Sequence, residues 1–419
     1  MRLPQNKTDK KDLSEDKVSF EEVSKMVDYF LENGFNYFDT AHGYHCGLSE
    51  IAVKNCLTSR HKREEYILTN KLTAHYFNNQ EEIYKFFNEQ LKICGVEYFD
   101  NYLIHSVSKN NYKKFLDCKA FESLVDLKNK GLIKHIGMSF HDSPELLDEI
   151  LKAHPELEMV QIQFNYIDFE DEKIKAKENY EVIRKYNKDI IVMEPVKGGK
   201  LANLPKEAEN IFSELSNFSP ASYAIRYAAS FDGVKMVLSG MSSFEQMKDN
   251  MTFMTNFEKL EEKDYKVIEK VVKILKNIDQ VPCTFCEYCL EGCPKNIFIP
   301  KLIELYNSHL IYPEADYSHD YELATRSSGK AGDCIKCKKC KKICPQQIYI
   351  TQVLEKISSE FENKKNKKKR KFKNFLFLLK FNFSFFLFLF YHFAFYFFQI
   401  FICHGKHKFD SVKLIYFAC

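Results

Sequence analysis

Eight of the fourteen cysteines fall into two short runs with the same internal spacing. The runs are Cys283-x2-Cys286-x2-Cys289-x3-Cys293-Pro294 and Cys334-x2-Cys337-x2-Cys340-x3-Cys344-Pro345. A cubane [4Fe–4S] cluster needs four thiolates, and the C-x2-C-x2-C spacing lets one loop reach three irons while the fourth thiolate comes from elsewhere. Structural zinc is the alternative, but it favours pairs of C-x2-C separated by a spacer. The repeated runs therefore indicate two iron–sulfur clusters.

The Cys-Pro at the end of each run is typical of two-cluster ferredoxins, in which the last cysteine of a run binds the other cluster. By that rule, the ligands of one cluster are Cys283, Cys286, Cys289 and Cys344. The ligands of the second cluster are Cys334, Cys337, Cys340 and Cys293. We therefore expect a small ferredoxin-like α+β module in this part of the chain.

The remaining cysteines have no ligand spacing and are interpreted as packing or tail residues: Cys46, Cys56, Cys94, Cys118, Cys403 and Cys419. A disulfide scaffold is disfavoured, because such scaffolds are short and secreted and no basic-then-apolar signal stands at the amino terminus. Clustered cysteines in a long chain instead indicate metal ligation in a reducing compartment, so we expect a cytoplasmic protein.

A second set of candidate residues, Asp39, Lys71, His105 and Ser139, ends four apolar runs at separations of 32, 34 and 34 residues. A (β/α)₈ barrel repeats at about that length, roughly 250 residues over eight units, and its chemistry gathers at the carboxyl ends of its strands. The spacing therefore predicts that these four side chains lie on one rim. A doubly wound sheet would also alternate strand and helix, but no G-x-G-x-x-G follows the first run.

The elements that must position this rim alternate between Phe20 and Leu238, which predicts a parallel α/β sheet. Helices are expected over Phe20–Asn33, Gln80–Cys94, Ala120–Lys130 and Pro144–Ala153. Strands are expected over Asn36–Thr40, Tyr66–Asn70, Tyr98–His105, Ile133–Ser139, Met159–Asn165, Ile190–Glu194 and Lys235–Ser239. Because a TIM barrel has eight strands and only seven are visible, we expect the first strand to lie upstream of a truncated start or to be missing from the barrel.

Four regions follow from this pattern: a barrel over 1–259, a linker helix over 260–280, the ferredoxin-like module over 281–355 and a tail over 361–419. The formal charge of +3 includes a basic run, 364–371, with seven positive charges. Without that run the chain is mildly acidic, so composition gives no reason to expect nucleic-acid binding.

The tail continues as the Phe-rich stretch Phe375–Cys403. It is long enough to span a bilayer and follows positive charge, as a membrane anchor would. However, polar residues interrupt it, and its Phe, Lys and Asn are encoded by A/T-rich codons. Two interpretations therefore stay open: translated non-coding or frameshifted sequence, or a genuine anchor that would bring the protein to a membrane.

The residues around Asp39 resemble a known family signature. Asp39-Thr40-Ala41-His42-Gly43-Tyr44, followed by Gly47-x-Ser49-Glu50, is similar to the D-T-A-x-x-Y…G-x-S-E signature of the aldo/keto reductases. Ile67-Leu68-Thr69-Asn70-Lys71 and Tyr102-Leu103-Ile104-His105 match further family motifs in order. With the twin cysteine runs, the chain resembles the ferredoxin-fused branch of that family over about residues 1–352. The resemblance implies a catalytic tetrad of Asp39, Tyr44, Lys71 and His105.

In that family a nicotinamide delivers hydride to a carbonyl carbon while the tyrosine protonates the oxygen. The ordinary pKa of tyrosine, about 10, makes it a slow proton carrier at neutral pH. We expect Lys71 to lower the pKa of Tyr44, Asp39 to hold the lysine charged, and His105 to orient the substrate oxygen. Taken singly, each of these residues also fits a turn, a surface charge or a structural role.

The resemblance also implies nucleotide contacts. Ser139 and Gln161 fall where the family's serine and glutamine hold the nicotinamide carboxamide, and Met193 falls where many members have a stacking tyrosine. The adenosine-phosphate segment of the family matches 238–250, with candidate contacts Gly240, Ser242, Gln246 and Asn250. Because only Lys248 is basic there, the choice between NAD and NADP stays open.

The implied function is an NAD(P)(H)-linked oxidoreductase that acts on a small carbonyl or alcohol and carries two [4Fe–4S] clusters, with a redox protein as a further partner. The alternative is a ferredoxin-type electron carrier whose barrel is a non-catalytic docking scaffold, membrane-tethered if the tail is genuine.

Overall fold

The computed structural model describes residues 3–5, 18–172, 174–215, 218–278, 280–283, 289–290, 292–311, 317–344, 348–363 and 414–418. Contacts within the chain divide it into two units, 1–272 together with 409–419, and 273–408. Each unit is described by itself.

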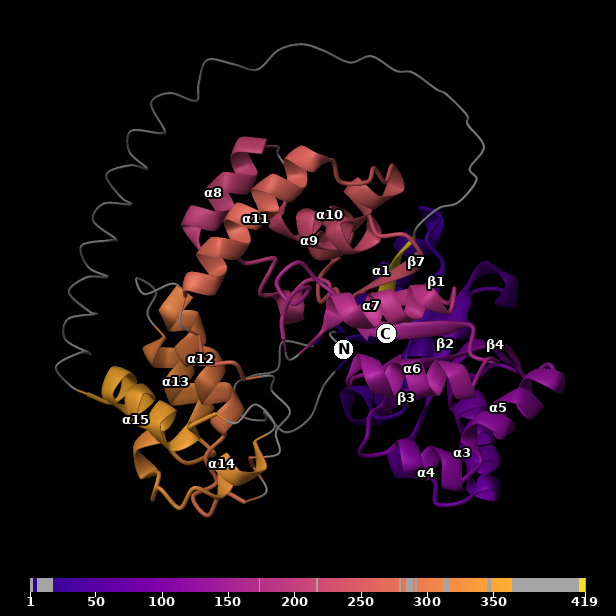
Figure 1. Cartoon of the computed structure of the whole chain (residues 1–419), viewed down its shortest axis with the longest axis horizontal. Coiled ribbons are helices and arrows are strands. Elements are labelled where there is room, and N and C mark those ends of the chain that lie inside the picture. The colour runs from indigo at the N-terminus through magenta and orange to yellow at the C-terminus, as the bar shows by residue number, and fades with distance from the viewer. Residues whose placement is uncertain are drawn as a thin grey trace, which may run out of the picture. The chain divides into compact units, whose positions relative to one another are not determined.

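The first unit is built on a closed, all-parallel barrel in which each strand pairs with the next along the chain and β8 pairs with β1 (Figure 1). The strands are β1 (Tyr37–Asp39), β2 (Ile67–Thr73), β3 (Phe99–Val107), β4 (Ile133–Phe140), β5 (Met159–Gln163), β6 (Asp189–Met193), β7 (Val234–Ser239) and β8 (Leu414–Ala418). The first seven confirm the seven strands expected from the sequence. Their interior residues are buried, as expected for strands covered on both faces.

The eighth strand comes from a part of the chain that the sequence did not indicate. An upstream strand was expected to be missing, but Leu414–Ala418 fills the position between Met236–Ser239 of β7 and Phe38–Asp39 of β1. This pairing satisfies two strand edges that would otherwise present unpaired backbone groups. Most of the tail, 364–413, with the basic run and the Phe-rich stretch, lies outside the described residues. Within the described part of the chain, no helix has the length and apolar character needed to cross a membrane.

Helices follow the strands and cover the barrel. In the first unit they are α1 (Phe20–Glu32), α2 (Leu48–Val53), α3 (Gln80–Cys94), α4 (Tyr112–Asp117), α5 (Ala120–Asn129), α6 (Pro144–Ala153), α7 (Ala176–Lys185), α8 (Lys206–Leu215), α9 (Pro220–Ala229) and α10 (Phe244–Thr255). Short helical turns are η1 (Tyr44–Gly47), η2 (Lys54–Thr58), η3 (Arg63–Glu65), η4 (Ala74–Tyr76) and η5 (Lys197–Gly199). The four predicted helices are confirmed as α1, α3, α5 and α6.

Side-chain caps define where several of these helices begin. Ser19, Asn79, Ser143, Ser219 and Ser243 each accept a hydrogen bond from the backbone N–H three residues later. Such a cap satisfies one of the amide groups that a helix start leaves unpaired. The caps therefore fix where these helices begin.

Close strand packing fixes the register of the rim. A Cβ atom at Gly137 in β4 would lie 2.5 Å from the Met159 side chain and 2.6 Å from Leu103, so only glycine fits between β3 and β5. The register pairs Ser139 with Gln161 across β4 and β5. Side chains near the carboxyl ends of β1 to β5 are therefore held in a fixed order.

The second unit contains α12 (Ile299–Ile311), α13 (Ser318–Ala324), η6 (Ala331–Asp333), α14 (Lys339–Ile343) and α15 (Ile350–Phe361), and α11 (Glu262–Asn277) stands at the expected linker helix. Its core gathers apolar side chains from α12 and α15 together with Cys289 and Cys340. Within the described residues of this unit, strand pairing is limited to one bridge, between Ile297 and Gly329. Two of the predicted cluster ligands, Cys289 and Cys340, thus belong to the packed core.

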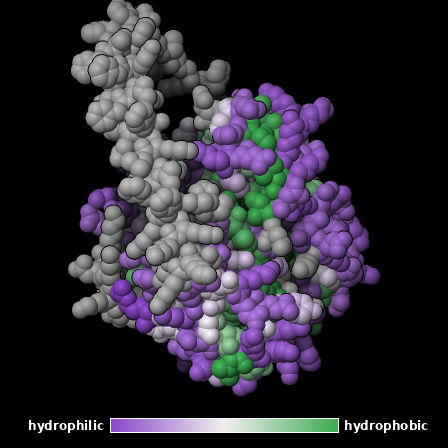
Figure 2. Space-filling view, turned by 90° about the vertical axis from the view of Figure 1, so that its left-hand side faces the viewer, coloured by the Kyte–Doolittle hydropathy of each residue, from purple (hydrophilic) through white to green (hydrophobic). Residues whose placement is uncertain are grey.

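The surface is largely polar, as the 28% charged residues suggest. Figure 2 shows one face on which hydrophilic residues cover most of the area that is not grey, with hydrophobic residues in a narrow band.

Candidate functional site

The four residues of the predicted tetrad lie together at one end of the barrel. Asp39 ends β1, Lys71 lies in β2, His105 lies in β3, and Tyr44 begins the turn η1 after β1. The Tyr44 Oη lies 3.4 Å from Nε2 of His105, and the Lys71 Nζ lies 4.9 Å from the centre of the Tyr44 ring. The strand-end spacing predicted one rim for Asp39, Lys71 and His105, which the structure brings together, whereas Tyr44 was expected from the family resemblance.

Lys71 and Asp39 form a fully buried ion pair inside the barrel. The Lys71 Nζ also donates to the Thr40 carbonyl at 2.8 Å. Burial acts to lower the pKa of the Lys71 ammonium, but the Asp39 carboxylate and the Tyr44 phenol together outweigh burial and the pKa is raised. Lys71 is therefore a cation at neutral pH, as the sequence predicted. The Asp39 Oδ2 has no hydrogen-bond partner among the described residues.

The net pKa shift of Tyr44 differs from the expectation. Burial raises the pKa of the phenol above 10, and the charge of Lys71 and a hydrogen bond with it act in the opposite direction without reversing the shift. The prediction that Lys71 lowers the pKa of Tyr44 was correct for its contribution but wrong for the net direction. Because a higher pKa keeps the proton on the phenol, Tyr44 at neutral pH is a proton donor.

His105 is held as a neutral imidazole. Burial, with smaller contributions from Lys71 and His141, lowers its pKa well below 6.5. Its Nδ1 lies 2.7 Å from Oγ1 of Thr73, its register partner in β2. A neutral imidazole carries one proton. The hydrogen bond with the Thr73 hydroxyl influences which of the two ring nitrogens of His105 holds that proton. Sequence analysis missed Thr73, since nothing in the sequence shows this pairing.

A buried network of polar side chains holds the backbone of Lys71. The Glu50 carboxylate is fully buried and accepts hydrogen bonds from Asn70 Nδ2 and Gln90 Nε2, both at 2.8 Å. Its other oxygen lies 2.7 Å from Nδ1 of His42, and this bond raises the pKa of His42. Asn70 Oδ1 accepts the Lys71 backbone N–H at 2.8 Å, and Gln90 Nε2 donates to the Lys71 carbonyl at 3.2 Å. The network fixes the backbone from which the ammonium extends; Gln90 carried no sequence signal.

The predicted carboxamide contacts lie on the neighbouring strands. Ser139 and Gln161 are buried and paired in register. Ser139 Oγ accepts the Ser106 N–H at 2.6 Å, while Gln161 Nε2 lies 3.4 Å from the sulfur of Met193. Gln161 Oε1 is buried without a hydrogen-bond partner among the described residues, and such an acceptor needs a donor. The amide group of a nicotinamide would supply that donor, so these residues fit the implied cofactor.

The predicted phosphate segment forms a loop into α10. Gln246 Oε1 accepts the Ser242 N–H at 2.8 Å, and the Gln246 N–H donates to the Ser243 cap at 3.3 Å. Asn250 is buried and donates to Ser239 Oγ at 2.9 Å. Gly240 joins β7 to this loop. The side chains of Gln246 and Asn250 thus shape the loop, and a nucleotide role for these residues stays a prediction.

A further buried carboxylate, Asp168 after β5, carried no prediction. Asp168 accepts hydrogen bonds from Gln163 Nε2 at 2.7 Å and Asn165 Nδ2 at 2.8 Å and pairs with Lys197 of η5. The Asn165 amide also donates to the Glu194 carbonyl at 3.0 Å. These bonds tie the loop after β5 to the loop after β6. No motif distinguished these residues.

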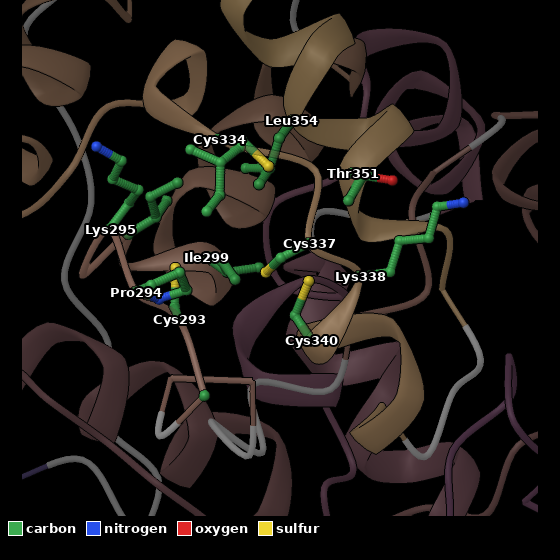
Figure 3. A pocket seen from close by; sticks show the side chains of 13 residues that line it. Cys293, Pro294, Lys295, Ile299, Cys334, Cys337, Lys338, Cys340, Thr351 and Leu354 are labelled. Atoms are coloured by element: carbon green, nitrogen blue, oxygen red, sulfur yellow. The ribbon is translucent and has the colours of Figure 1, made fainter.

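In the second unit, four cysteines line one cavity (Figure 3). They are Cys293, Cys334, Cys337 and Cys340, the ligand set predicted for one cluster. Burial, together with charge on the other three thiols, raises the pKa of Cys340. Among the described residues, no group of three or more His, Cys, Asp or Glu side chains could hold a single metal ion. Four thiols converging on one cavity fit a cubane cluster, whose irons are bound at separate corners.

The other predicted ligand set is described in part. Cys289 is buried in the core of the unit, and Cys283 and Cys344 pack against that core. Cys286 lies outside the described residues. This set stays a prediction.

The cysteines assigned to packing behave as expected where they are described. Cys56, Cys94 and Cys118 are buried and free. The side chain of Cys46 and the residues Cys403 and Cys419 lie outside what the structure describes.

Two family models match this chain. The model of the aldo/keto reductase family matches residues 7–273, and that of the 4Fe-4S dicluster domain matches residues 282–349. The two matched regions contain the tetrad and the cysteine cavity, respectively.

Individual relatives match parts of the chain. The chain is 24% identical over 279 residues to the uncharacterized oxidoreductase YqkF of Bacillus subtilis (strain 168), covering 59% of this chain and 87% of that protein. It is 29% identical to the 9,11-endoperoxide prostaglandin H2 reductase of Trypanosoma cruzi (strain CL Brener), covering 49% and 68%. Other relatives are matched over 16% to 49% of their length.

Solved structures share the fold. An aldo-keto reductase from Klebsiella pneumoniae in complex with NADPH superimposes with a TM-score of 0.51 at 14% identity, covering 65% of this chain and 90% of that one. At this identity the likeness concerns the fold alone.

Proposed function

Because the chain belongs to the aldo/keto reductase family and carries a 4Fe-4S dicluster domain, we propose that it is an NAD(P)(H)-linked oxidoreductase of small carbonyls or alcohols that also passes electrons through two [4Fe–4S] clusters. The observation that carries the proposal is the convergence of Tyr44, Lys71, Asp39 and His105 on one rim. The predicted clusters and the free thiols of the described cysteines support a reducing compartment such as the cytoplasm.

Each residue of the rim has a different role in carbonyl reduction. Nε2 of His105 and the phenol of Tyr44, 3.4 Å apart, both reach the position of a substrate oxygen between them. Tyr44 holds the proton that this oxygen must receive, because its pKa is raised by burial. Lys71 stabilises the phenolate that is left after the transfer, since its ammonium is fixed beside the ring. Asp39 keeps that ammonium charged.

The nucleotide would supply the hydride that completes the reduction of the carbonyl carbon. Gln161 and Ser139 would orient it, with the unpartnered Gln161 Oε1 as acceptor for the carboxamide. Met193 lies beside Gln161 and would pack on the ring through its thioether, without the π face of an aromatic residue. A solved structure of the same fold was determined in complex with NADPH, which supports a nicotinamide nucleotide as the cofactor.

The dicluster domain adds one-electron carriers to a two-electron reaction. Cys293, Cys334, Cys337 and Cys340 would hold one cluster, and Cys283, Cys286, Cys289 and Cys344 the other. A hydride carries two electrons and each cluster passes one, so two clusters match one hydride equivalent.

The test uses the full chain, since β8 at its end belongs to the barrel. The protein is purified anaerobically, assayed for iron and sulfide, and observed in the visible range as NADH or NADPH is added. About eight irons per chain, with bleaching by one nucleotide, is the expected result. Methylglyoxal reduction by the wild type and its loss in Tyr44→Phe would confirm the role of the rim. Nucleotide binding without any carbonyl reduction would instead favour an electron carrier with a non-catalytic barrel.

A further inference from the structure

We propose that the surface around the second cysteine run docks a small electron-transfer protein whose own redox centre is surrounded by acidic side chains. This surface, the basic face, is defined by Ile335, Lys336, Lys338, Lys339, Lys341, Lys342, Ile343 and Tyr349. The inference rests on the proposed function, because docking there is useful only if the adjoining cavity holds a cluster.

The charge of the basic face is concentrated and one-sided. Five lysines and no acidic residue stand between Cys334 and Cys344. Lys336 pairs with Glu355, whereas no salt bridge among the described residues involves Lys338, Lys339 or Lys342. All three of these lysines are exposed. Their charge is therefore available to a partner.

Two of the lysines have a backbone conformation that is strained for a residue other than glycine. Lys336 and Lys338 have φ angles of +57° and +61°, in the left-handed region that glycine adopts most readily. The loop can wrap around the cavity with this geometry while the side chains leave it, and Lys338 points away from the cysteines in Figure 3.

Apolar side chains lie among the lysines. Ile335, Ile343 and Tyr349 are exposed by 57%, 47% and 56%, respectively. The Lys341 Nζ lies 3.8 Å from the centre of the Tyr349 ring. Exposed apolar residues with charged residues around them are typical of a protein-binding surface. A protein partner is favoured over an anionic membrane by the adjoining cavity, because a cluster held there would need a redox partner.

The cavity opens at this face. Ile335 and Lys338 line it together with Cys337, which is an exposed cysteine. A cluster held there would therefore have an edge at the surface, so a docked redox centre comes within a short distance of it. The lysines would steer an acidic partner to that edge, because complementary charge raises the association rate.

The experiment measures binding of the full-length protein, purified anaerobically with iron and sulfide verified, to a flavodoxin whose surface around the FMN is acidic. The test variant is Lys338→Glu/Lys339→Glu/Lys342→Glu. The control, Lys85→Glu/Lys92→Glu/Lys152→Glu, makes the same change of charge on exposed lysines of α3 and α6. Dissociation constants are measured by calorimetry between about 10 mM and about 500 mM salt.

We expect the test variant to bind flavodoxin at least about tenfold more weakly at low salt, the control to stay within about twofold of wild type, and salt to weaken the wild-type complex. Cytochrome c, with a basic surface around its haem, should not bind. Equal affinity of test and control variants would overturn the proposal, as would binding of vesicles with anionic lipid headgroups without binding of flavodoxin.

The same preparations separate this inference from the proposed function. Methylglyoxal reduction and iron content are measured on each variant and should match wild type. If both are retained while flavodoxin fails to bind, the docking inference alone is wrong. If iron is absent from the wild type, the cluster premise fails and the docking inference falls with it.

Discussion

The phenol of Tyr44 and the imidazole of His105 face each other across the mouth of the barrel. Their polar atoms, Oη and Nε2, are 3.4 Å apart, and the two rings are nearly perpendicular at 84°. Burial holds His105 neutral and Tyr44 protonated, so the pair can present two uncharged donors to one substrate oxygen. That arrangement favours carbonyl reduction, in which the oxygen must gain a proton.

Removal of the phenolic oxygen should abolish proton donation while the site stays intact. We expect Tyr44→Phe to lower kcat for methylglyoxal reduction by about 10²–10⁴. Nucleotide affinity, measured by fluorescence quenching, should stay unchanged because the ring is retained. Tyr84→Phe is the matched control, since that phenol donates to Asp126 on the surface of the barrel. A comparable loss in both variants would contradict the assignment.

The pH profile should reflect both shifted groups. The Tyr44 proton is available below a pKa that lies above 10, so reduction should decline only as pH rises through that value. His105 is neutral above a pKa well below 6.5, so no histidine inflection should occur near neutrality. We therefore expect kcat/KM for reduction to be flat between about pH 7 and about pH 10. An inflection near pH 6.5 that disappears in His105→Gln would show that His105 titrates normally.

The parts of this site that sequence predicts are those carried by strand periodicity and motif spacing. Asp39, Lys71 and His105 end apolar runs at the repeat of the barrel, so their meeting could be expected. Thr73 could not be found, because its contact with His105 depends on the register of β2 against β3. The direction of the pKa shift of Tyr44 could not be predicted either. Burial raises this pKa by more than the charge of Lys71 lowers it, and the sequence shows the lysine but not the burial.

The same distinction applies to the fold. Seven strands are apolar runs that alternate with amphipathic segments, and the sequence shows both signals. The strand Leu414–Ala418 follows the Phe-rich stretch, which the sequence indicated to be non-coding sequence or a membrane anchor. The strand also pairs with residues far away in the chain. The cysteine cavity was predictable because the ligand spacing itself carries the rule that Cys293 joins the second run.

Thr73 should act as a positioning residue for His105. If its hydroxyl donates to Nδ1, then Nε2 carries the proton and can donate to the substrate. Thr73→Val removes that donor, and we expect kcat to fall by roughly fivefold, in line with one lost hydrogen bond of about 1 kcal/mol. Thr73→Ser should restore the rate. Nitrogen chemical shifts of His105 would report the tautomer; an unchanged tautomer in the valine variant would exclude this role.

The buried pair of Asp39 and Lys71 should be more costly to break than to replace. Lys71→Met leaves the Asp39 carboxylate buried without its cation, and we expect a loss of about 3–5 kcal/mol in the free energy of unfolding. Asp39→Asn together with Lys71→Met should lose less than Lys71→Met alone. Urea unfolding followed by circular dichroism measures both. Lys185→Met, which breaks the exposed pair with Asp148, is the control and should have no measurable effect.

The assignment of Cys293 to the second run can be tested cluster by cluster. Cys293 lies in the first run of the sequence but lines the same cavity as Cys334, Cys337 and Cys340. We therefore expect Cys293→Ala and Cys337→Ala to remove the same electron paramagnetic resonance signal from the reduced protein, and each to lower iron from about eight to about four per chain. Cys118→Ala, in the barrel, should change neither quantity. If Cys293→Ala instead removed the signal that depends on Cys289, each run would supply all four ligands of its own cluster.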